Sequence, residues 1–316
     1  MPILRNSGPD RALMPTDNGV LLLSIRDGAV YEQLATGLAQ CQRHDHAVGG
    51  IVAVLIHPRG TSPRWRSVRV MMVGKAAELR TMATLETPIP ATDVVWLGGR
   101  LVICGEASSG SRAWIVDPFA DQPIWRPLEM PSELESPRKG FDALVSNGRQ
   151  LIAIDNIVFP KYSVVYESGH GEVPQLVRVA ELAANGSYEH VHSASNGRSV
   201  FAVHSTTMGR NRGATFISLY RHSNLALRAV LQLPCRPVFH AMQEDDLWLL
   251  WPDEPGVLRR YAIDMLKEPV LAPYSLVLVE TRHFDVPYDR MLTSAYGRIV
   301  LGTGSVDGPF EILGDE

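Results

Sequence analysis

Apolar runs alternate with polar turns along the chain, and the turns recur at a fixed interval. Each turn has a glycine followed within a few residues by an apolar run, and these glycines are Gly50, Gly99, Gly148, Gly197 and Gly297. The first four are 49 residues apart and the last gap is 100 residues, so a further turn is expected near residue 246. Asp245 and Asp246, which suit a turn, stand there before the apolar residues 247–251. Self-similarity at a fixed period predicts a repeat protein, here with six units.

The interior of each unit predicts four short strands. Around Gly99 these are residues 94–96, 101–104, 113–116 and the more polar 123–128. β-branched and aromatic residues dominate such segments and turn residues bound them, as expected for antiparallel strands. Residues 30–40 could form either a helix or a strand, because Val30, Leu34 and Leu38 recur at helical spacing.

The repeats account for nearly the whole chain. Six periods of 49 residues take up 294 of the 316 residues, so residues 1–316 are expected to form a single domain. The last unit begins near Asp289 and has room for about three strands. We expect residues 19–25, a further apolar segment, to complete this unit and close the ring, because closure removes exposed sheet edges.

Four short antiparallel strands in each period of this length are typical of a propeller blade. On these repeats the chain resembles the β-propeller superfamily across essentially its whole length. The resemblance implies an all-β fold, a six-bladed propeller closed by the N-terminal strand, or seven blades if residues 19–38 form their own blade. It indicates no subfamily, because the GH…WD pairs of WD40 repeats and the sialidase Asp-box are absent, and Gly49-Gly50 and Gly98-Gly99 precede the second strand, unlike kelch glycines. The resemblance therefore implies an architecture and no activity.

In a propeller the first strand of every blade lines the central channel, and its start lies at the mouth that usually binds ligands. Polar residues recur at these starts: His44, His46, Asp93, Asp142, His190, His192, His240 and Asp289. On a regular strand His190 and His192 lie on one side. Imidazoles and carboxylates suit divalent transition metals, so His44, His46, His192 and His240 are predicted metal ligands. His190, Asp93, Asp142 and Asp289 are predicted to bind a ligand, or, in the alternative interpretation, to cap turns and tie adjacent blades together.

Charge and motifs narrow the function further. Arg210 and Arg212 lie in a predicted loop at the same mouth and suit a small anionic ligand or an acidic partner. With 30 basic and 34 acidic residues the net charge is -4, which disfavours nucleic-acid binding. The motifs GxGxxG, GxxxxGK[ST], HExxH and GxSxG are absent, which argues against the common nucleotide and hydrolase classes.

The N-terminal residues, the apolar runs and the cysteines indicate where in the cell the protein is expected. The N-terminal residues contain no apolar run of signal-peptide length, and the apolar runs elsewhere are too short to span a bilayer, so we expect a cytoplasmic protein with no membrane partner. Cys41, Cys104 and Cys235 are far apart and lack CxxC spacing, so neither a disulfide framework nor a zinc-thiolate site is expected.

Two functions follow from these observations. The first is a binding module that presents its loops and channel mouth to a protein partner or a small ligand. The second is a metal-dependent hydrolase, lyase or oxygenase that uses the histidines at the channel mouth. Whether the chain is an enzyme is left open by the sequence.

Overall fold

The computed structural model describes a large part of the chain. The described residues are 10–16, 19–26, 29–35, 44–47, 51–56, 65–73, 79–105, 107, 110–131, 141–155, 161–169, 173–182, 188–195, 200–207, 215–233, 239–243, 246–251, 254–263, 274–293, 298–303, 305 and 307–313.

Within these residues the regular structure is β-strand, in five hydrogen-bonded sheets. The first sheet holds β1 (Asp10–Thr16), β2 (Gly19–Arg26) and β3 (Ala29–Ala35). The second holds β4 (His44–Ala47), β5 (Ile51–Ile56), β6 (Trp65–Val73), β7 (Leu79–Leu97), β8 (Arg100–Gly105), β9 (Ala113–Val116) and β10 (Arg126–Pro127). The third holds β11 (Phe141–Ser146), β12 (Gln150–Asp155), β13 (Lys161–Glu167) and β14 (Gln175–Leu182).

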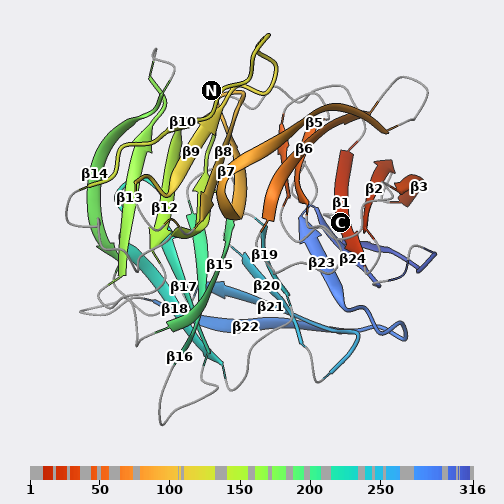
Figure 1. Cartoon of the computed structure of the whole chain (residues 1–316). Coiled ribbons are helices and arrows are strands. Elements are labelled where there is room, and N and C mark those ends of the chain that lie inside the picture. The colour runs from red at the N-terminus through yellow and green to blue at the C-terminus, as the bar shows by residue number, and fades with distance from the viewer. Residues whose placement is uncertain are drawn as a thin grey trace.

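The fourth sheet is the largest. It holds β15 (Tyr188–Ser195), β16 (Val200–Thr207), β17 (Thr215–Arg221), β18 (Leu227–Leu233), β19 (Phe239–Gln243), β20 (Asp246–Leu250), β21 (Val257–Ile263) and β22 (Tyr274–His283). The fifth holds β23 (Arg290–Thr293), β24 (Ile299–Gly302) and β25 (Glu311–Leu313). Figure 1 shows the sheets following one another in chain order, with β1–β3 beside β23 and β24.

The expected number of blades is wrong at the level of hydrogen-bonded sheets, since the described strands form five sheets and not six or seven. Two sheets each contain two successive runs of four strands. The 19-residue β7 pairs with β6 along its first half and with β8 along its last, so it is shared by two runs. β18 and β22 are joined by a short parallel pairing, Ala229 with Tyr274 and Val230 with Ser275. These two junctions merge runs that the sequence repeat separates.

The predicted repeat itself is present. The hairpins β4–β5, β7–β8, β11–β12, β15–β16, β19–β20 and β23–β24 have second strands that begin at residues 51, 100, 150, 200, 246 and 299. Gly99 and Gly148 occupy two of the turns with φ near +83°, a backbone conformation that side chains with a Cβ rarely adopt. Glycine is therefore needed at these turns, which is why the glycines mark the repeat.

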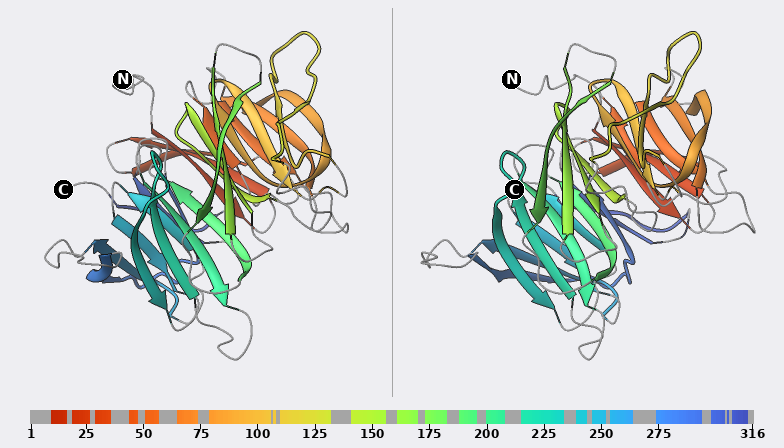
Figure 2. Two further views of the ribbon diagram at one scale, coloured as in Figure 1. Left: turned by 90° about the vertical axis from the view of Figure 1, so that its left-hand side faces the viewer. Right: turned by 60° about the vertical axis from the view of Figure 1, so that its left-hand side comes forward.

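The apolar cores lie between successive runs of strands, which explains why the second strands are continuously apolar. In β12, Leu151 and Ala153 belong to a core shared with β8 and β9, while Ile152 and Ile154 belong to a core shared with β16 and β17. Side chains of a strand alternate between its two faces, so burial of both faces requires an uninterrupted apolar run. Figure 2 shows this stacking, as the chain passes from β11–β14 through the teal β15–β18 to the blue strands.

The N-terminal strands do not complete the last sheet, contrary to the sequence prediction. β2 pairs with β1 on one edge and with β3 on the other, so both of its edges are already occupied. The first sheet instead packs against β23–β25 through an apolar core of Met14, Leu23, Ile25 and Val300. Of residues 30–40, which were left open between helix and strand, those up to Ala35 belong to strand β3 and the others lie outside the described residues.

Two further expectations concern cysteines and membranes. The buried thiol of Cys104 lies 3.6 Å from the hydroxyl oxygen of Thr92, whereas Cys41 and Cys235 lie outside the described residues. The part of the chain described here contains no helix with the length and apolar character needed to cross a bilayer.

Candidate functional site

The structure places the predicted channel-mouth residues on or next to first strands. His44 and His46 lie in β4, Asp93 in β7, Asp142 in β11, His190 and His192 in β15, His240 in β19, and Asp289 directly before β23. Contacts link these strands in chain order, β4 to β7, β7 to β11, β11 to β15, β15 to β19 and β19 to β23. The equal spacing in sequence thus corresponds to one structural position in successive runs.

Side chains are described at only two of these positions, Asp93 and Asp289. At the five histidines and at Asp142 the structure describes the backbone alone, and Arg210 and Arg212 lie outside the described residues. Among the described side chains, no group of three His, Cys, Asp or Glu residues could hold a metal ion. This finding concerns Asp93 and Asp289 and does not extend to the histidines.

Asp93 ties two consecutive first strands together. Its side chain is buried, and the two carboxylate oxygens accept hydrogen bonds from the backbone N–H of Val94 at 3.0 Å and of Leu144 at 2.8 Å. Leu144 belongs to β11, the first strand of the next run. The Thr92 hydroxyl adds a second link by donating to the Phe141 carbonyl at 3.0 Å. Asp93 therefore performs the blade-tying role that was the alternative to ligand binding.

Asp289 has a different environment. Its side chain is 51% exposed, and one carboxylate oxygen lies 3.2 Å from a guanidinium nitrogen of Arg290. Its backbone N–H donates to the carbonyl of Gly302 at 3.2 Å, which holds the start of β23 against β24. The carboxylate is open to solvent, so a ligand can reach it without displacing a structural hydrogen bond of the backbone.

β-bulges interrupt several first strands near the predicted mouth. The register shifts between Ala91 and Asp93 in β7, between Phe141 and Ala143 in β11, and between Tyr188 and Val191 in β15. Asp142 and His190 fall inside these shifts. A bulge breaks strict alternation, so the placement of His190 and His192 on one side of β15 stays a prediction from the sequence.

A buried histidine that the sequence did not single out lies in the turn between β17 and β18. His222 is 2% exposed, and its ring meets that of Phe201 edge-on with centroids 5.0 Å apart. Burial lowers the pKa of His222 to about 4, so the imidazole is neutral at pH 7. No spacing pattern includes this residue, and only the packing of the turn reveals its burial.

We expect His222 to make the fold sensitive to mild acid. The unfolded chain binds a proton at a pKa near 6.5 and the folded chain only near 4, so the stabilisation is complete above pH 6.5 and is lost as pH falls toward 4. Between pH 7 and pH 5 the wild type should lose about 2 kcal/mol of unfolding free energy through this group. Urea unfolding at both pH values should show a loss smaller by that amount in His222→Gln. Equal losses in the two proteins would contradict this assignment.

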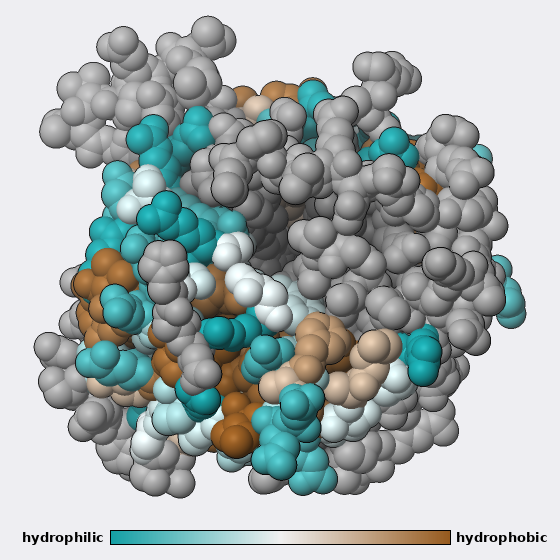
Figure 3. Space-filling view, turned by 90° about the horizontal axis from the view of Figure 1, so that it is seen from above, coloured by the Kyte–Doolittle hydropathy of each residue, from teal (hydrophilic) through white to brown (hydrophobic). Residues whose placement is uncertain are grey.

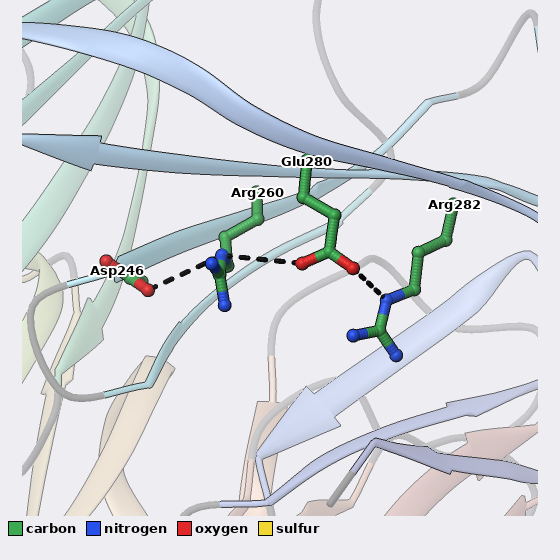
Figure 4. A network of polar contacts seen from close by, with 4 residues as sticks. All are labelled: Asp246, Arg260, Glu280 and Arg282. Carbon is green, nitrogen blue, oxygen red and sulfur yellow. Dashed lines mark hydrogen bonds and ion pairs between the residues drawn. The ribbon is translucent and has the colours of Figure 1, made fainter. Parts of the chain in front are cut away.

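A network of charged side chains crosses β20, β21 and β22 (Figure 4). Arg260 lies 3.6 Å from Asp246 and 3.5 Å from Glu280, and Arg282 is hydrogen-bonded to Glu280. The guanidinium carbons of Arg260 and Arg282 lie 5.6 and 5.8 Å from the centroid of the Trp248 ring. The charges balance and the side chains are 28–41% exposed, so the network orders this face while contributing little net stability.

Comparison with known proteins bears on the fold. No protein-family model matches the chain, and no curated protein matches it in sequence. The β-propeller domain of Cps50 (Swd1) from Myceliophteria thermophila superposes with a TM-score of 0.59 at 10% identity, over 97% of this chain and 96% of that one. The WD40 domain of Toxoplasma gondii coronin gives 0.59 at 12% identity, over 98% and 80%. A protein from Lactobacillus plantarum gives 0.58 at 11% identity, over 96% and 91%.

These similarities and the repeat of short antiparallel strands define the class of protein. The chain has a β-propeller fold, as the sequence resemblance implied, and its structural neighbours include WD40 domains. No subfamily within that fold is identified.

Proposed function

We propose that the protein is a binding module whose partner is another protein, and that the partner docks an extended apolar segment against β22. The observation that carries this proposal is a run of three consecutive exposed apolar residues in β22. Val277, Leu278 and Val279 are 36%, 50% and 46% exposed. A run of this kind on a sheet edge is a site where another chain can add a strand.

The backbone of β22 supports this proposal. Residues 276–278 and 280–283 of β22 pair with β21 on one edge, with a register shift at Val279, whereas on the other edge β18 reaches only Tyr274 and Ser275. Among the described strands, none pairs with that second edge beyond Ser275. An extended segment could therefore use the backbone groups of β22 while its side chains contact Leu278 and its neighbours.

Other outer strands have a more polar exposed surface. In the first half of β7 the exposed residues include Arg80, Thr84 and Glu86, with Met82 as the one large apolar side chain. Polar and charged residues are the usual protection of an edge against association. On the face of the molecule seen from above, apolar residues gather in patches, and hydrophilic residues border these patches (Figure 3). The WD40 fold of the structural neighbours supports a protein partner.

Quantitative co-purification tests the proposed partner surface. The wild type should retain a protein at near-stoichiometric amount from an extract of its own cells, and the double variant Leu278→Glu, Val279→Glu should lose it. Met82→Glu, an equally drastic change at a 43% exposed position on another outer strand, is the matched control and should retain it. Circular dichroism verifies that all three are folded. Equal retention by both variants, or no stoichiometric protein with the wild type, would overturn the proposal.

We further propose how the sheets are arranged and where the protein is located. We infer that the five sheets follow one another around one closed ring. The apolar packing of β1–β3 against β23–β25 supports closure between the first and last of them. A cytoplasmic location, and a small anionic ligand at Arg210 and Arg212, remain predictions from the sequence.

A further inference from the structure

The turn between β11 and β12 contains the dipeptide Asn147-Gly148, and both residues belong to the described part of the chain. Asn147 directly follows β11, and its backbone N–H donates to the carbonyl of Gln150 at 3.2 Å. Gly148 is exposed with φ of +83°, and a Cβ atom there would meet nothing within 4 Å. The backbone nitrogen of Gly148 therefore lies in an open turn and is not hindered by a side chain of its own residue.

The side-chain carbonyl of Asn147 is held by two backbone donors. Its Oδ1 atom accepts the N–H of Arg149 at 3.1 Å and the N–H of Gln150 at 2.8 Å. Two N–H groups on one carbonyl oxygen draw electron density from the carbonyl carbon and stabilise the negative charge that develops on the oxygen when a nucleophile attacks that carbon. The turn thus makes the Cγ atom of Asn147 more electrophilic.

The nucleophile next to this carbon is the backbone nitrogen of Gly148. Its N–H donates to the hydroxyl oxygen of Ser146 at 3.1 Å. The nitrogen must lose its proton in order to attack a carbonyl carbon, and a positioned acceptor assists that transfer. The reacting groups belong to adjacent residues whose backbone and side chains are held by hydrogen bonds, so little entropy is lost in bringing them together. Residues 146–148 therefore combine an activated carbonyl group, a nucleophile and a proton acceptor.

We propose that Asn147 is a self-modification site, at which the turn promotes loss of the side-chain amide without an enzyme. The Gly148 nitrogen forms a bond to Cγ of Asn147, and its proton passes through the Ser146 hydroxyl and water to Nδ2. The bond between Cγ and Nδ2 then breaks, so that ammonia leaves and a cyclic imide remains. Water opens the imide at either carbonyl and gives aspartate or isoaspartate at position 147. Water is the only co-reactant, and the reaction needs neither an oxidant nor a reductant.

The modification would change the hairpin of β11 and β12. Aspartate adds one negative charge to a chain with a net charge of -4, and isoaspartate inserts a methylene group into the backbone of the turn. Either product replaces the amide whose oxygen now accepts the N–H groups of Arg149 and Gln150. We therefore expect the modification to loosen the pairing of β11 with β12. The site lies in a different sheet from β22, and the proposal does not depend on the protein-binding surface there.

Peptide mapping of the full chain by mass spectrometry tests this site. The protein is incubated in heavy-oxygen water at mildly alkaline pH, and the label that enters position 147 is measured in the folded chain and in the chain unfolded by guanidinium chloride. We expect the folded chain to react about 10-fold faster at this position. The sequence also has Asn-Gly at 18–19, 185–186 and 196–197, and these positions are internal references in the unfolded chain. A folded chain that reacts no faster than the unfolded chain would overturn the proposal.

Ser146→Ala tests the proton acceptor. It should slow the reaction in the folded chain about 5-fold, because one hydrogen bond to the attacking group is lost. Ser146→Thr keeps a hydroxyl group and should react as the wild type does. Ser223→Ala, at an exposed serine in the turn between β17 and β18, is the matched control and should leave the rate unchanged. Circular dichroism verifies that all the variants are folded. Equal rates in Ser146→Ala and the wild type would contradict the role of the hydroxyl group.

Discussion

Replacing Gly105 with alanine is expected to lower the free energy of unfolding by about 3–5 kcal/mol, a loss at the upper end for single substitutions. Gly105 ends β8 and is paired with Ala91. A Cβ atom at Gly105 would lie 2.0 Å from the carbonyl oxygen of Pro90 and 3.1 Å from the Cα of Ala91. Both contacts are with backbone atoms, which cannot rotate away as a side chain can.

The surrounding structure prevents an easy shift. The Gly105 N–H donates to the carbonyl of Arg112 at 3.0 Å, which fixes it to the start of β9. The atoms it would meet belong to the part of β7 that passes from one run of strands to the next. Relief of the overlap would therefore move two runs apart, at the point where Ala91 is fully buried.

Urea unfolding followed by circular dichroism measures this effect, with Gly110→Ala as the matched control. Gly110 has φ of +77°, and a Cβ there would meet nothing within 4 Å. Gly110→Ala should lower the free energy of unfolding by only about 1–2 kcal/mol, because the sole penalty is a side chain in a left-handed backbone conformation. A Gly105→Ala variant as stable as Gly110→Ala would show that β7 and β8 separate without loss, against the packing described here.

Much of the fold was predictable because each repeat depends on residue types that a local stretch of sequence reveals. Glycine turns such as Gly99 and Gly148 need positive φ, and strands such as β12 are apolar throughout because both faces are buried. Glycine turns and continuously apolar strands can both be recognised in a single sequence. The number of sheets could not be predicted in this way, because it depends on strand pairing between runs. β7 continues from one run into the next, and β18 pairs with β22 through two residue pairs. The strand β1 was missed as well, and with it the pairing that occupies both edges of β2.

The candidate site was predictable in position but less so in role. Counting back from each turn located the first strands, and the structure has Asp93 and His240 there. Spacing alone gives no information about the hydrogen-bond partner of a side chain, and the partner of Asp93 is a backbone N–H some 50 residues away in sequence. Bulges such as the one between Tyr188 and Val191 also change which residues share a face.

Replacing Asp93 with alanine is expected to cost about 3 kcal/mol of unfolding free energy, because two hydrogen bonds to a buried carboxylate are lost together. The substitution would leave the buried N–H groups of Val94 and Leu144 without their acceptor. Asp93→Asn should cost less, about 1–2 kcal/mol, because one oxygen remains and the amide nitrogen faces a donor. Denaturant titration of both variants provides the comparison.

Asp289→Ala is the matched control for this prediction, since Asp289 also precedes or starts a first strand but is 51% exposed. Its loss should change stability by no more than about 0.5 kcal/mol. The two aspartates thus separate the two roles that the sequence assigns to their common position. If Asp93→Ala is as mild as Asp289→Ala, the carboxylate does not tie β7 to β11, and ligand binding becomes the better explanation of its burial. If it is severe while Asp289→Ala is not, a search for ligand contacts at the first strands should begin at Asp289.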